Sequence, residues 1–237
     1  MSFASLGLAP ALVRAADLQG CLAPTPVQAS AIPAVLQGAD LLALAPTGSG
    51  KTLAYLLPLI QRLQIARWPA PRRTQALVLL PTRELAQQVG AVCSALARTL
   101  IAPPKVVVAH GGVSINPQLM ALRGGAEVVI ATPGRLLDLL AHRGLRLQSL
   151  HTLVLDEADR LLEAGFAAEW AQIRLALPAG SDRRGLVAPP RARLQHLLFS
   201  ATLPPEVQAL AAGLGGVAAL RIDLRSACEI AAEADAA

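Results

Sequence analysis

Seven short runs of aliphatic residues recur along the chain, and most of them end in a small, polar or proline residue. They are DLLALA (40–45), ALVLLP (76–81), KVVVAH (105–110), EVVIATP (127–133), TLVLDEA (152–158), HLLFSAT (196–202) and ALRID (219–223). Apolarity within a run is continuous rather than alternating, which is typical of strands buried on both faces of a sheet. Such strands need a layer of helices on each side, so this pattern limits the fold more than any other feature.

Helical patterns lie between the runs. They cover residues 52–64, 82–100, 115–124, 134–144 and 204–215. The alternation predicts an α/β fold with a parallel sheet of about seven strands and helices on both faces. Ligands of such sheets bind beyond the carboxyl ends of the strands. The polar residues that end the aliphatic runs are therefore the first candidates for function.

Composition fits one large domain with an aliphatic core. The chain has 237 residues, of which 54 % are hydrophobic and only 3 % aromatic. No apolar run reaches the ~18 residues of a membrane span, and residues 1–10 do not resemble a signal peptide. Three widely separated cysteines argue against a disulfide framework or a zinc site. We expect a monomeric, cytoplasmic protein without membrane contact, whose net charge of +5 permits a polyanionic partner.

A glycine-rich loop, residues 45–52 (APTGSGKT), lies between the first aliphatic run and a helical pattern. Gly48 and Gly50 let backbone N–H groups turn toward an anion. Lys51 can then reach the β- and γ-phosphates of a nucleotide, and the Thr52 hydroxyl can bind Mg²⁺. The strict pattern has glycine where this chain has Ala45, and a glycine turn with a chance lysine is the alternative. The loop alone does not distinguish a kinase, a switch and a motor.

Two adjacent carboxylates, Asp156 and Glu157, end the fifth aliphatic run. Burying both would be costly without a cation or another purpose. Asp156 can hold Mg²⁺ through water, and Glu157 is placed to polarise an attacking water. A helix-capping acidic cluster is the structural alternative. A base beside a metal carboxylate favours water as the acceptor, and hence hydrolysis over kinase chemistry.

Residues 156–159, Asp-Glu-Ala-Asp, are the signature after which the DEAD-box RNA helicases are named. Residues 3–224 resemble the first RecA-like domain of that family, a P-loop NTPase fold, and Ala45 is the usual residue there. GCLAPTPVQ (20–28) is similar to the Q motif that recognises adenine, although Cys21 replaces the usual Phe or Tyr. The resemblance implies ATP and Mg²⁺ as cofactors, with Gln28 reading the adenine edge and Phe3 stacking on the base.

The resemblance also implies the role of each matching segment. Nucleotide binding is assigned to Phe3, Thr25, Gln28, Pro46, Thr47, Gly48, Ser49, Gly50, Lys51 and Thr52, with Thr52 and Asp156 for the metal. RNA binding is assigned to Pro81, Thr82, Arg83, Gly111, Gly112, Gln118, Thr132, Pro133, Gly134 and Arg135. Coupling between ATP and strand separation is assigned to Asp159, Ser200 and Thr202, and catalysis to Glu157, Lys51 and Asp156. Contacts to phosphates by Arg83 and Arg135 would position RNA without reading its sequence.

The resemblance implies two domains in the parent protein, of which the 237 residues supply the first. We expect residues 1–224 to form the RecA-like domain and 225–237 a tail or the start of a linker. A second RecA-like domain would supply the arginine finger for hydrolysis, so this part alone should bind nucleotide but not unwind RNA. Residues 177–193 read as a long basic loop, and the scattered histidines and cysteines as structural.

The leading hypothesis is therefore the ATP-binding half of an ATP-dependent RNA helicase. A helicase acting on DNA is an alternative that the Q motif and the Asp-Glu-Ala-Asp signature disfavour. A nucleotide-gated RNA-binding or scaffold module that never unwinds remains open. A metabolite kinase is the third alternative, disfavoured because no lid or acceptor pocket is recognisable.

Overall fold

The aliphatic runs form one parallel sheet. The structure is a computed structural model that describes residues 1–65, 72–163, 165–178, 193–214 and 219–225. The strands are β1 (Leu41–Leu44), β2 (Ala76–Leu79), β3 (Val106–Ala109), β4 (Val128–Ala131), β5 (Thr152–Leu155), β6 (Gln195–Ser200) and β7 (Leu220–Asp223). Their order is β3-β4-β2-β5-β6-β1-β7, and all neighbours pair in parallel. Each strand coincides with one predicted run, so the predicted α/β fold with seven strands is confirmed.

Helices follow most of the strands. They are η1 (Ala4–Leu6), α1 (Pro10–Leu18), α2 (Pro26–Gln37), α3 (Lys51–Ile65), α4 (Arg83–Ala97), α5 (Asn116–Ala121), α6 (Pro133–Ala141), α7 (Ala158–Glu163), α8 (Phe166–Ala176) and α9 (Pro205–Leu214). The five predicted helical patterns correspond to α3, α4, α5, α6 and α9. Sequence patterns did not indicate the other helices.

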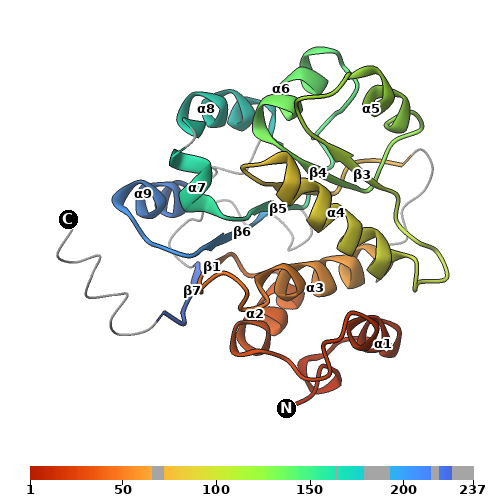
Figure 1. The fold of residues 1–237 in the computed structure, drawn as a ribbon, viewed down its shortest axis with the longest axis vertical. Coiled ribbons are helices and arrows are strands. Elements are labelled where there is room, and N and C mark those ends of the chain that lie inside the picture. Colours follow the sequence, from red (N-terminus) through yellow and green to blue (C-terminus); the bar gives the residue numbers. More distant parts are fainter. Residues whose placement is uncertain (66–71, 164, 179–192, 215–218, 226–237) are drawn as a thin grey trace.

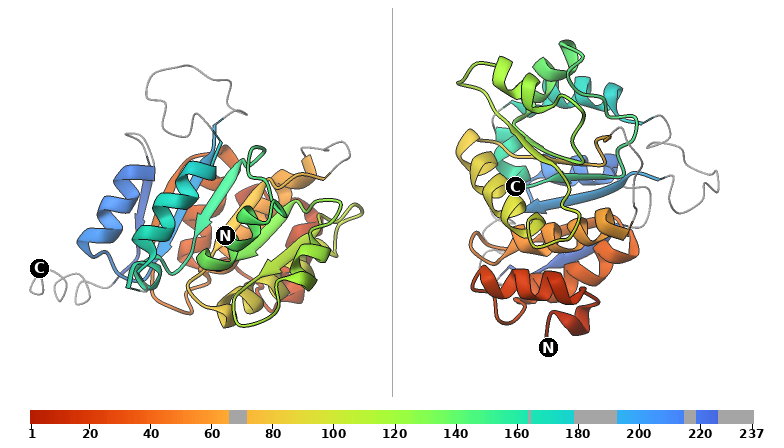
Figure 2. Two further views of the ribbon diagram at one scale, coloured as in Figure 1. Left: turned by 90° about the horizontal axis from the view of Figure 1, so that it is seen from above. Right: turned by 90° about the vertical axis from the view of Figure 1, so that its right-hand side faces the viewer.

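The sheet is covered on both faces, as its continuous apolar runs require (Figures 1 and 2). Helices α1 to α4 pack on one face, and α5 to α9 pack on the other. Successive residues of β1 alternate between them: Leu41 and Ala43 belong to the core under α1–α4, whereas Leu42 and Leu44 belong to the core under α5–α9. Cys93 is buried in the first of these cores, and burial raises its pKa to about 12.

Strand order divides the site-bearing edge of the sheet into two halves. The phosphate loop, the acidic tetrapeptide and the Ser-Ala-Thr segment follow β1, β5 and β6, which are adjacent. The three segments assigned to RNA follow β2, β3 and β4, which are also adjacent. The fold thus places the expected nucleotide residues on one half of this edge and the expected RNA residues on the other.

Some predictions fall outside the described residues. Most of the basic loop at 177–193 and nearly all of the tail at 225–237 belong to this group, so the domain boundary after residue 224 stays a prediction. Among the residues that are described, no helix combines the length and the apolar character needed to cross a bilayer.

Candidate functional site

The phosphate loop connects the carboxyl end of β1 to the first turn of α3. Gly48 and Gly50 have φ angles of 79° and 94°, in the region that only glycine adopts freely. A Cβ atom at Gly50 would lie 2.5 Å from the amide nitrogen of Gln28 and 3.1 Å from the Thr25 hydroxyl. Glycine at this position therefore permits both the turn and the close approach of the segment that resembles the Q motif.

Lys51 begins α3 and carries its ammonium into the loop. The side chain is buried, its Nζ donates to the carbonyl oxygen of Ala45 at 2.9 Å, and it lies 3.7 Å from Glu157 Oε1. Lysine has three N–H donors, so the group can still donate to an anion. The structure thus brings the lysine and the acidic pair together, as the two sequence motifs predicted.

Asp156 lies beyond the last residue of β5, with 3 % of its surface exposed. Its Oδ2 accepts a hydrogen bond of 2.8 Å from the Tyr55 hydroxyl, and its Oδ1 accepts one of 2.9 Å from the Glu157 N–H. Burial raises the pKa of Asp156 to about 6, against the Tyr55 hydrogen bond that lowers it, and the charge of Glu157 raises it further. A carboxylate in this state would gain from a cation beside it.

Tyr55 is a site residue that the sequence reasoning missed. It is fully buried, and burial followed by the charge of Asp156 raises its pKa well above the ordinary value. A signal was available, because it is the only tyrosine in the chain and lies four residues after Lys51, on the same face of a helix. Its hydroxyl fixes one oxygen of Asp156.

Glu157 has a strained backbone. Its φ angle is 53°, in the left-handed region that costs a residue with a side chain ~1–2 kcal/mol. Its Oε2 is buried and makes no hydrogen bond within the described part of the chain, and the same holds for Ser49 Oγ. Strain and unpaired polar atoms of this kind concentrate at functional sites. These two oxygens around the loop fit a site that receives a polar ligand.

Asp159, Ser200 and Thr202 meet in the structure. Asp159 Oδ2 accepts hydrogen bonds from the Thr202 N–H and hydroxyl, both at 2.9 Å. The Asp159 N–H donates to Ser200 Oγ at 3.2 Å. Burial raises the pKa of Asp159, but the hydrogen bonds from Thr202 outweigh it and the pKa is lowered. The acidic tetrapeptide after β5 and the segment after β6 are thereby joined through ionised Asp159.

Gln28 links α2 to the phosphate loop. Its Oε1 accepts from the Thr25 N–H at 3.0 Å within a capping box, and its Nε2 donates to the Gly50 carbonyl at 3.0 Å. Only 1 % of its surface is exposed. Each end of the amide thus already has one partner, and the reading of adenine by Gln28 stays a prediction.

Phe3 also differs from expectation. The ring is 1 % exposed and packs in the core beneath α1–α4. A short apolar segment that precedes an amphipathic helix is well suited to such packing. In this arrangement the ring presents no open face on which a base could stack.

The segments assigned to RNA lie where α4 and α6 begin. Thr82 caps α4 by accepting from the Leu85 N–H at 3.3 Å, and Thr132 occupies the equivalent position before α6. Arg83 is well exposed, and a Cβ atom at Gly112 would lie 3.1 Å from its Nη1. Helix amino termini, backbone N–H groups and an exposed guanidinium are suited to phosphate groups.

Arg135 and Gln118 are buried rather than exposed, each with 8 % of its surface accessible. Arg135 Nη2 donates to the Val113 carbonyl at 2.8 Å, and Gln118 Nε2 donates to the His110 carbonyl at 3.1 Å. Both side chains hold the loop at 110–114, which carries the glycine pair. The expected open fork at Arg135 is therefore a clamp on this loop, and only its Nη1 makes no hydrogen bond within the described residues.

Comparison with known proteins settles the family. The DEAD/DEAH box helicase family model matches residues 25–210. The chain belongs to this family. The matched range of the DEAD/DEAH family contains every site residue predicted above except Phe3.

Relatives in the family agree in name and in fold. The ATP-dependent RNA helicase DeaD of Buchnera aphidicola subsp. Baizongia pistaciae is 41 % identical over 208 residues, which are 88 % of this chain and 32 % of the relative. The ATP-dependent RNA helicase dbp10 of Schizosaccharomyces pombe is 41 % identical over 226 residues, 95 % of this chain and 25 % of the relative. The crystal structure of a DEAD box protein from the hyperthermophile Methanococcus jannaschii has a TM-score of 0.80 and 32 % identity, and the match covers 95 % of this chain and 56 % of that one. The chain thus spans about a quarter to a third of the length of these curated relatives.

Proposed function

We propose that the chain is the ATP-binding, first RecA-like domain of an ATP-dependent RNA helicase. In the parent protein, ATP binding and hydrolysis would drive the unwinding of RNA duplexes or the remodelling of RNA–protein complexes. One observation carries the proposal: Lys51 lies 3.7 Å from Glu157, and Asp159 binds Thr202, so β1, β5 and β6 converge on one site. Membership of the DEAD/DEAH box family and the names of the relatives support it.

In this proposal the phosphate loop and Lys51 bind the phosphates of ATP. Proteins usually hold Mg²⁺ through one or two carboxylates together with substrate phosphates, and Asp156 with Thr52 is a ligand set of this kind. When bound, the ion would neutralise negative charge on the phosphates. The raised pKa of Asp156 supports this role, because a neighbouring cation would offset the cost of its buried charge. Glu157 would orient the attacking water and take its proton.

Adenine recognition is assigned to Gln28 and Thr25. The amide of Gln28 keeps one N–H and one lone pair beyond the hydrogen bonds it makes to Gly50 and Thr25. Reading the base with this side chain would link base identity to the shape of the phosphate loop. Stacking by Phe3 would first require its buried ring to become uncovered.

RNA would bind across the ends of β2, β3 and β4. Arg83 is the exposed group for a direct phosphate contact. The other residues assigned to RNA follow the same three adjacent strands and would add backbone contacts; they are Pro81, Thr82, Gly111, Gly112, Thr132, Pro133 and Gly134. Arg135 and Gln118 would act by shaping the glycine loop. A second RecA-like domain is the inferred partner that completes both sites. We also infer a cytoplasmic location, which unpaired Cys21 and Cys93 support.

The test is the ATPase rate of the full-length protein with single-stranded RNA, single-stranded DNA or no polymer. We expect hydrolysis that RNA stimulates much more strongly than DNA. Equal stimulation by both polymers would favour the DNA-helicase alternative. An ATPase rate that neither polymer changes would count against a helicase, and phosphate transfer to a small molecule would show a kinase.

A further inference from the structure

The edge of the sheet opposite the proposed ATP and RNA sites is strongly cationic. Because all neighbouring strands are parallel, the segments that lead into β2, β3, β4 and β5 share this edge. Within these segments lie the cations Arg72, Arg73, Arg98, Lys105, Arg123, Arg143 and Arg146. The only carboxylate in the same segments, residues 72–75, 98–105, 122–127 and 142–151, is Glu127. This excess is larger than the net charge of +5 of the whole chain.

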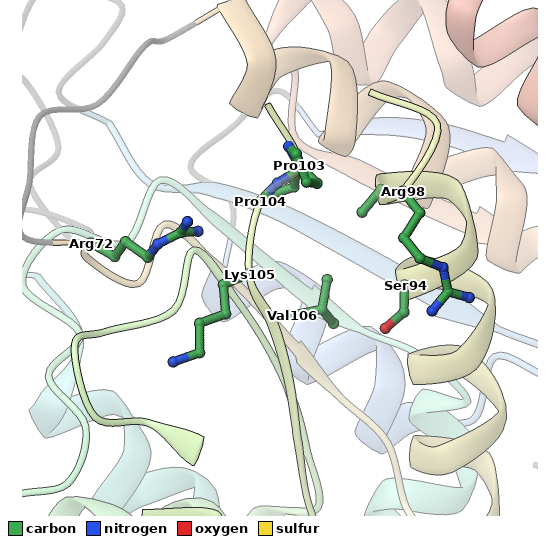
Figure 3. A pocket seen from close by; sticks show the side chains of 8 residues that line it. Arg72, Ser94, Arg98, Pro103, Pro104, Lys105 and Val106 are labelled. Atoms are coloured by element: carbon green, nitrogen blue, oxygen red, sulfur yellow. The ribbon is translucent and has the colours of Figure 1, made fainter. Parts of the chain in front are cut away.

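Two hollows lie among these cations. The first has a volume of about 340 Å³ and is lined by Arg72, Arg98 and Lys105, with Ser94 on α4 (Figure 3). The second has a volume of about 610 Å³ and is lined by Arg72, Arg73, Arg143 and Arg146. Arg72 lines both hollows, so they adjoin each other, and none of the described residues that line them is acidic. We call these seven cations and the two hollows the basic edge.

Most of the charge on the basic edge is not neutralised. Glu127 pairs with Arg72 at 2.9 Å and also accepts from the Lys105 N–H at 2.8 Å. Within the described residues, the other arginines that line the hollows have no carboxylate partner; these are Arg73, Arg98, Arg143 and Arg146. Exposed cations that converge without counter-charges repel one another, so a bound polyanion would relieve this repulsion.

One of these cations occupies an unusual position. Arg143 follows the end of α6 with a φ angle of 54°, where helices usually end in glycine or asparagine. An arginine in this conformation is strained relative to glycine. The chain therefore carries an arginine at a turn where the backbone favours a residue without a Cβ atom, and its charge suits the carboxyl end of a helix.

We propose that the basic edge is a second binding site for the phosphate backbone of RNA. The cations extend across the ends of four adjacent strands, about 14 Å at the usual strand spacing, which matches a short stretch of regularly spaced phosphates. Guanidinium groups suit phosphates as planar forks and act independently of base sequence. The choice of RNA as the polyanion rests on the proposed function, whereas the existence of a polyanion site does not.

A site on this edge would extend the proposed helicase function. RNA held at the basic edge stays near the opposite edge, which raises the local concentration of the same strand at the helicase site. The basic edge would thus keep the protein on one RNA between cycles without taking part in ATP chemistry.

The test compares Arg146→Glu with the charge-matched Arg14→Glu, since Arg14 is exposed on α1, away from the basic edge. RNA affinity is measured by fluorescence anisotropy over a salt series, with a labelled single strand long enough to reach both edges. We expect Arg146→Glu to weaken binding about three- to tenfold at ~0.1 M salt and to lower the slope of log affinity against log salt by about 1. Arg14→Glu should change both quantities much less. Thermal unfolding checks that each variant folds, and Arg146→Gln is used in place of Arg146→Glu if the latter does not fold.

Three other results would overturn the proposal or its choice of RNA as the ligand. Equal losses in Arg146→Glu and Arg14→Glu would overturn the proposal, because binding would then follow overall charge. Polyglutamate that binds as tightly as RNA and also depends on Arg146 would overturn the choice of RNA in favour of an acidic protein partner. Loss of RNA binding through Arg83→Glu with no change through Arg146→Glu would overturn the basic edge and leave the proposed function intact. The proposed function itself would fail if RNA did not stimulate the ATPase of the full-length protein, whereas stimulation that survived Arg83→Glu would overturn only the role assigned to Arg83.

Discussion

Asp156 shows how a single residue can be costly to the fold and useful to the site. The folded protein binds the proton of Asp156 with a pKa of about 6, against an ordinary value of 3.8. Because the folded state holds this proton more tightly than the unfolded chain does, stability falls as pH rises through about 4 to about 6. Ionised and without a cation, the buried carboxylate therefore destabilises the fold above that range by up to ~3 kcal/mol.

Asp156→Asn should relieve that cost. The neutral amide removes the buried charge, but its single oxygen accepts only one of the two hydrogen bonds, so we expect a net gain of ~1–2 kcal/mol at neutral pH. The gain should shrink as pH falls from about 6 to about 4, because folded wild-type Asp156 then binds a proton and no longer buries a charge. Urea unfolding at several pH values, without nucleotide or Mg²⁺, measures this gain in stability. Asp17→Asn, at an exposed position on α1, is the control. A variant that is less stable than wild type at neutral pH would contradict the argument.

Glu157→Gln should separate binding from turnover in the full-length protein. The amide keeps the shape of the side chain but cannot take a proton from water. We expect nearly unchanged ATP affinity in calorimetry and loss of steady-state hydrolysis. Lys51→Ala is the contrasting variant, because it removes the ammonium beside the loop and should weaken ATP binding itself. Normal hydrolysis by Glu157→Gln would show that another group accepts the proton.

At the scale of elements, the strands were predictable and several helices were not. A strand buried on both faces needs an unbroken aliphatic run, and residues 76–79 and 128–131 are runs of this kind. Helix α2 begins at Pro26 and contains Pro33, which hides its periodicity although proline is compatible with a first helical position. Helix α7 is short and begins inside the acidic tetrapeptide, at Ala158, and α8 begins soon after it, at Phe166. Strand order then brought the predicted site segments together.

Side-chain placement was harder to predict than the position of motifs. Arg135 and Gln28 were identified as site residues, but their partners are carbonyls of loops distant in sequence, namely Val113 and Gly50. Such contacts depend on the packed structure rather than on the local pattern. Tyr55 was missed for the same reason, because its acceptor Asp156 is 101 residues away.

Gln28 gives a prediction about α2 and the phosphate loop as a unit. Gln28→Ala removes one partner from the capping box and from Gly50, so it should destabilise the protein by ~1 kcal/mol even without nucleotide. If Gln28 also reads adenine, the variant should lose ~1–3 kcal/mol of ADP affinity and its preference for ADP over GDP. Thermal unfolding and calorimetry with both nucleotides separate the two effects, and Thr25→Ser, which keeps the cap, is the control. An unchanged preference for ADP would leave Gln28 with its structural role alone.

At the scale of the whole molecule, nucleotide and RNA residues are built on one sheet. Segments after β5, β6 and β1 carry the residues proposed to bind ATP, and those after β2, β3 and β4 carry the residues proposed to bind RNA. Adjacent strands β2 and β5 pair in register from Ala76 to Leu79, and both helix layers pack on the same strands. Among the described residues these strands form one continuous sheet in packed cores, which deform little, whereas coupling between sites is best carried by an element with two discrete arrangements. The motion that joins the sites is therefore expected between this domain and a second one.

Residues 1–237 alone should accordingly bind nucleotide and RNA almost independently. They should also hydrolyse ATP very slowly, because an arginine finger, worth ~10³–10⁵ in rate, is expected from a second RecA-like domain.

The test of this independence is RNA affinity, measured with and without a non-hydrolysable ATP analogue, at fixed salt because phosphate contacts are screened. Arg146→Glu is tested in parallel so that binding at the basic edge does not hide coupling at the helicase site. The full-length protein is the positive control and should bind RNA more tightly with the analogue. A tightening of about tenfold in residues 1–237, which is ~1.4 kcal/mol of coupling, would show that this domain couples nucleotide and RNA binding without a second one.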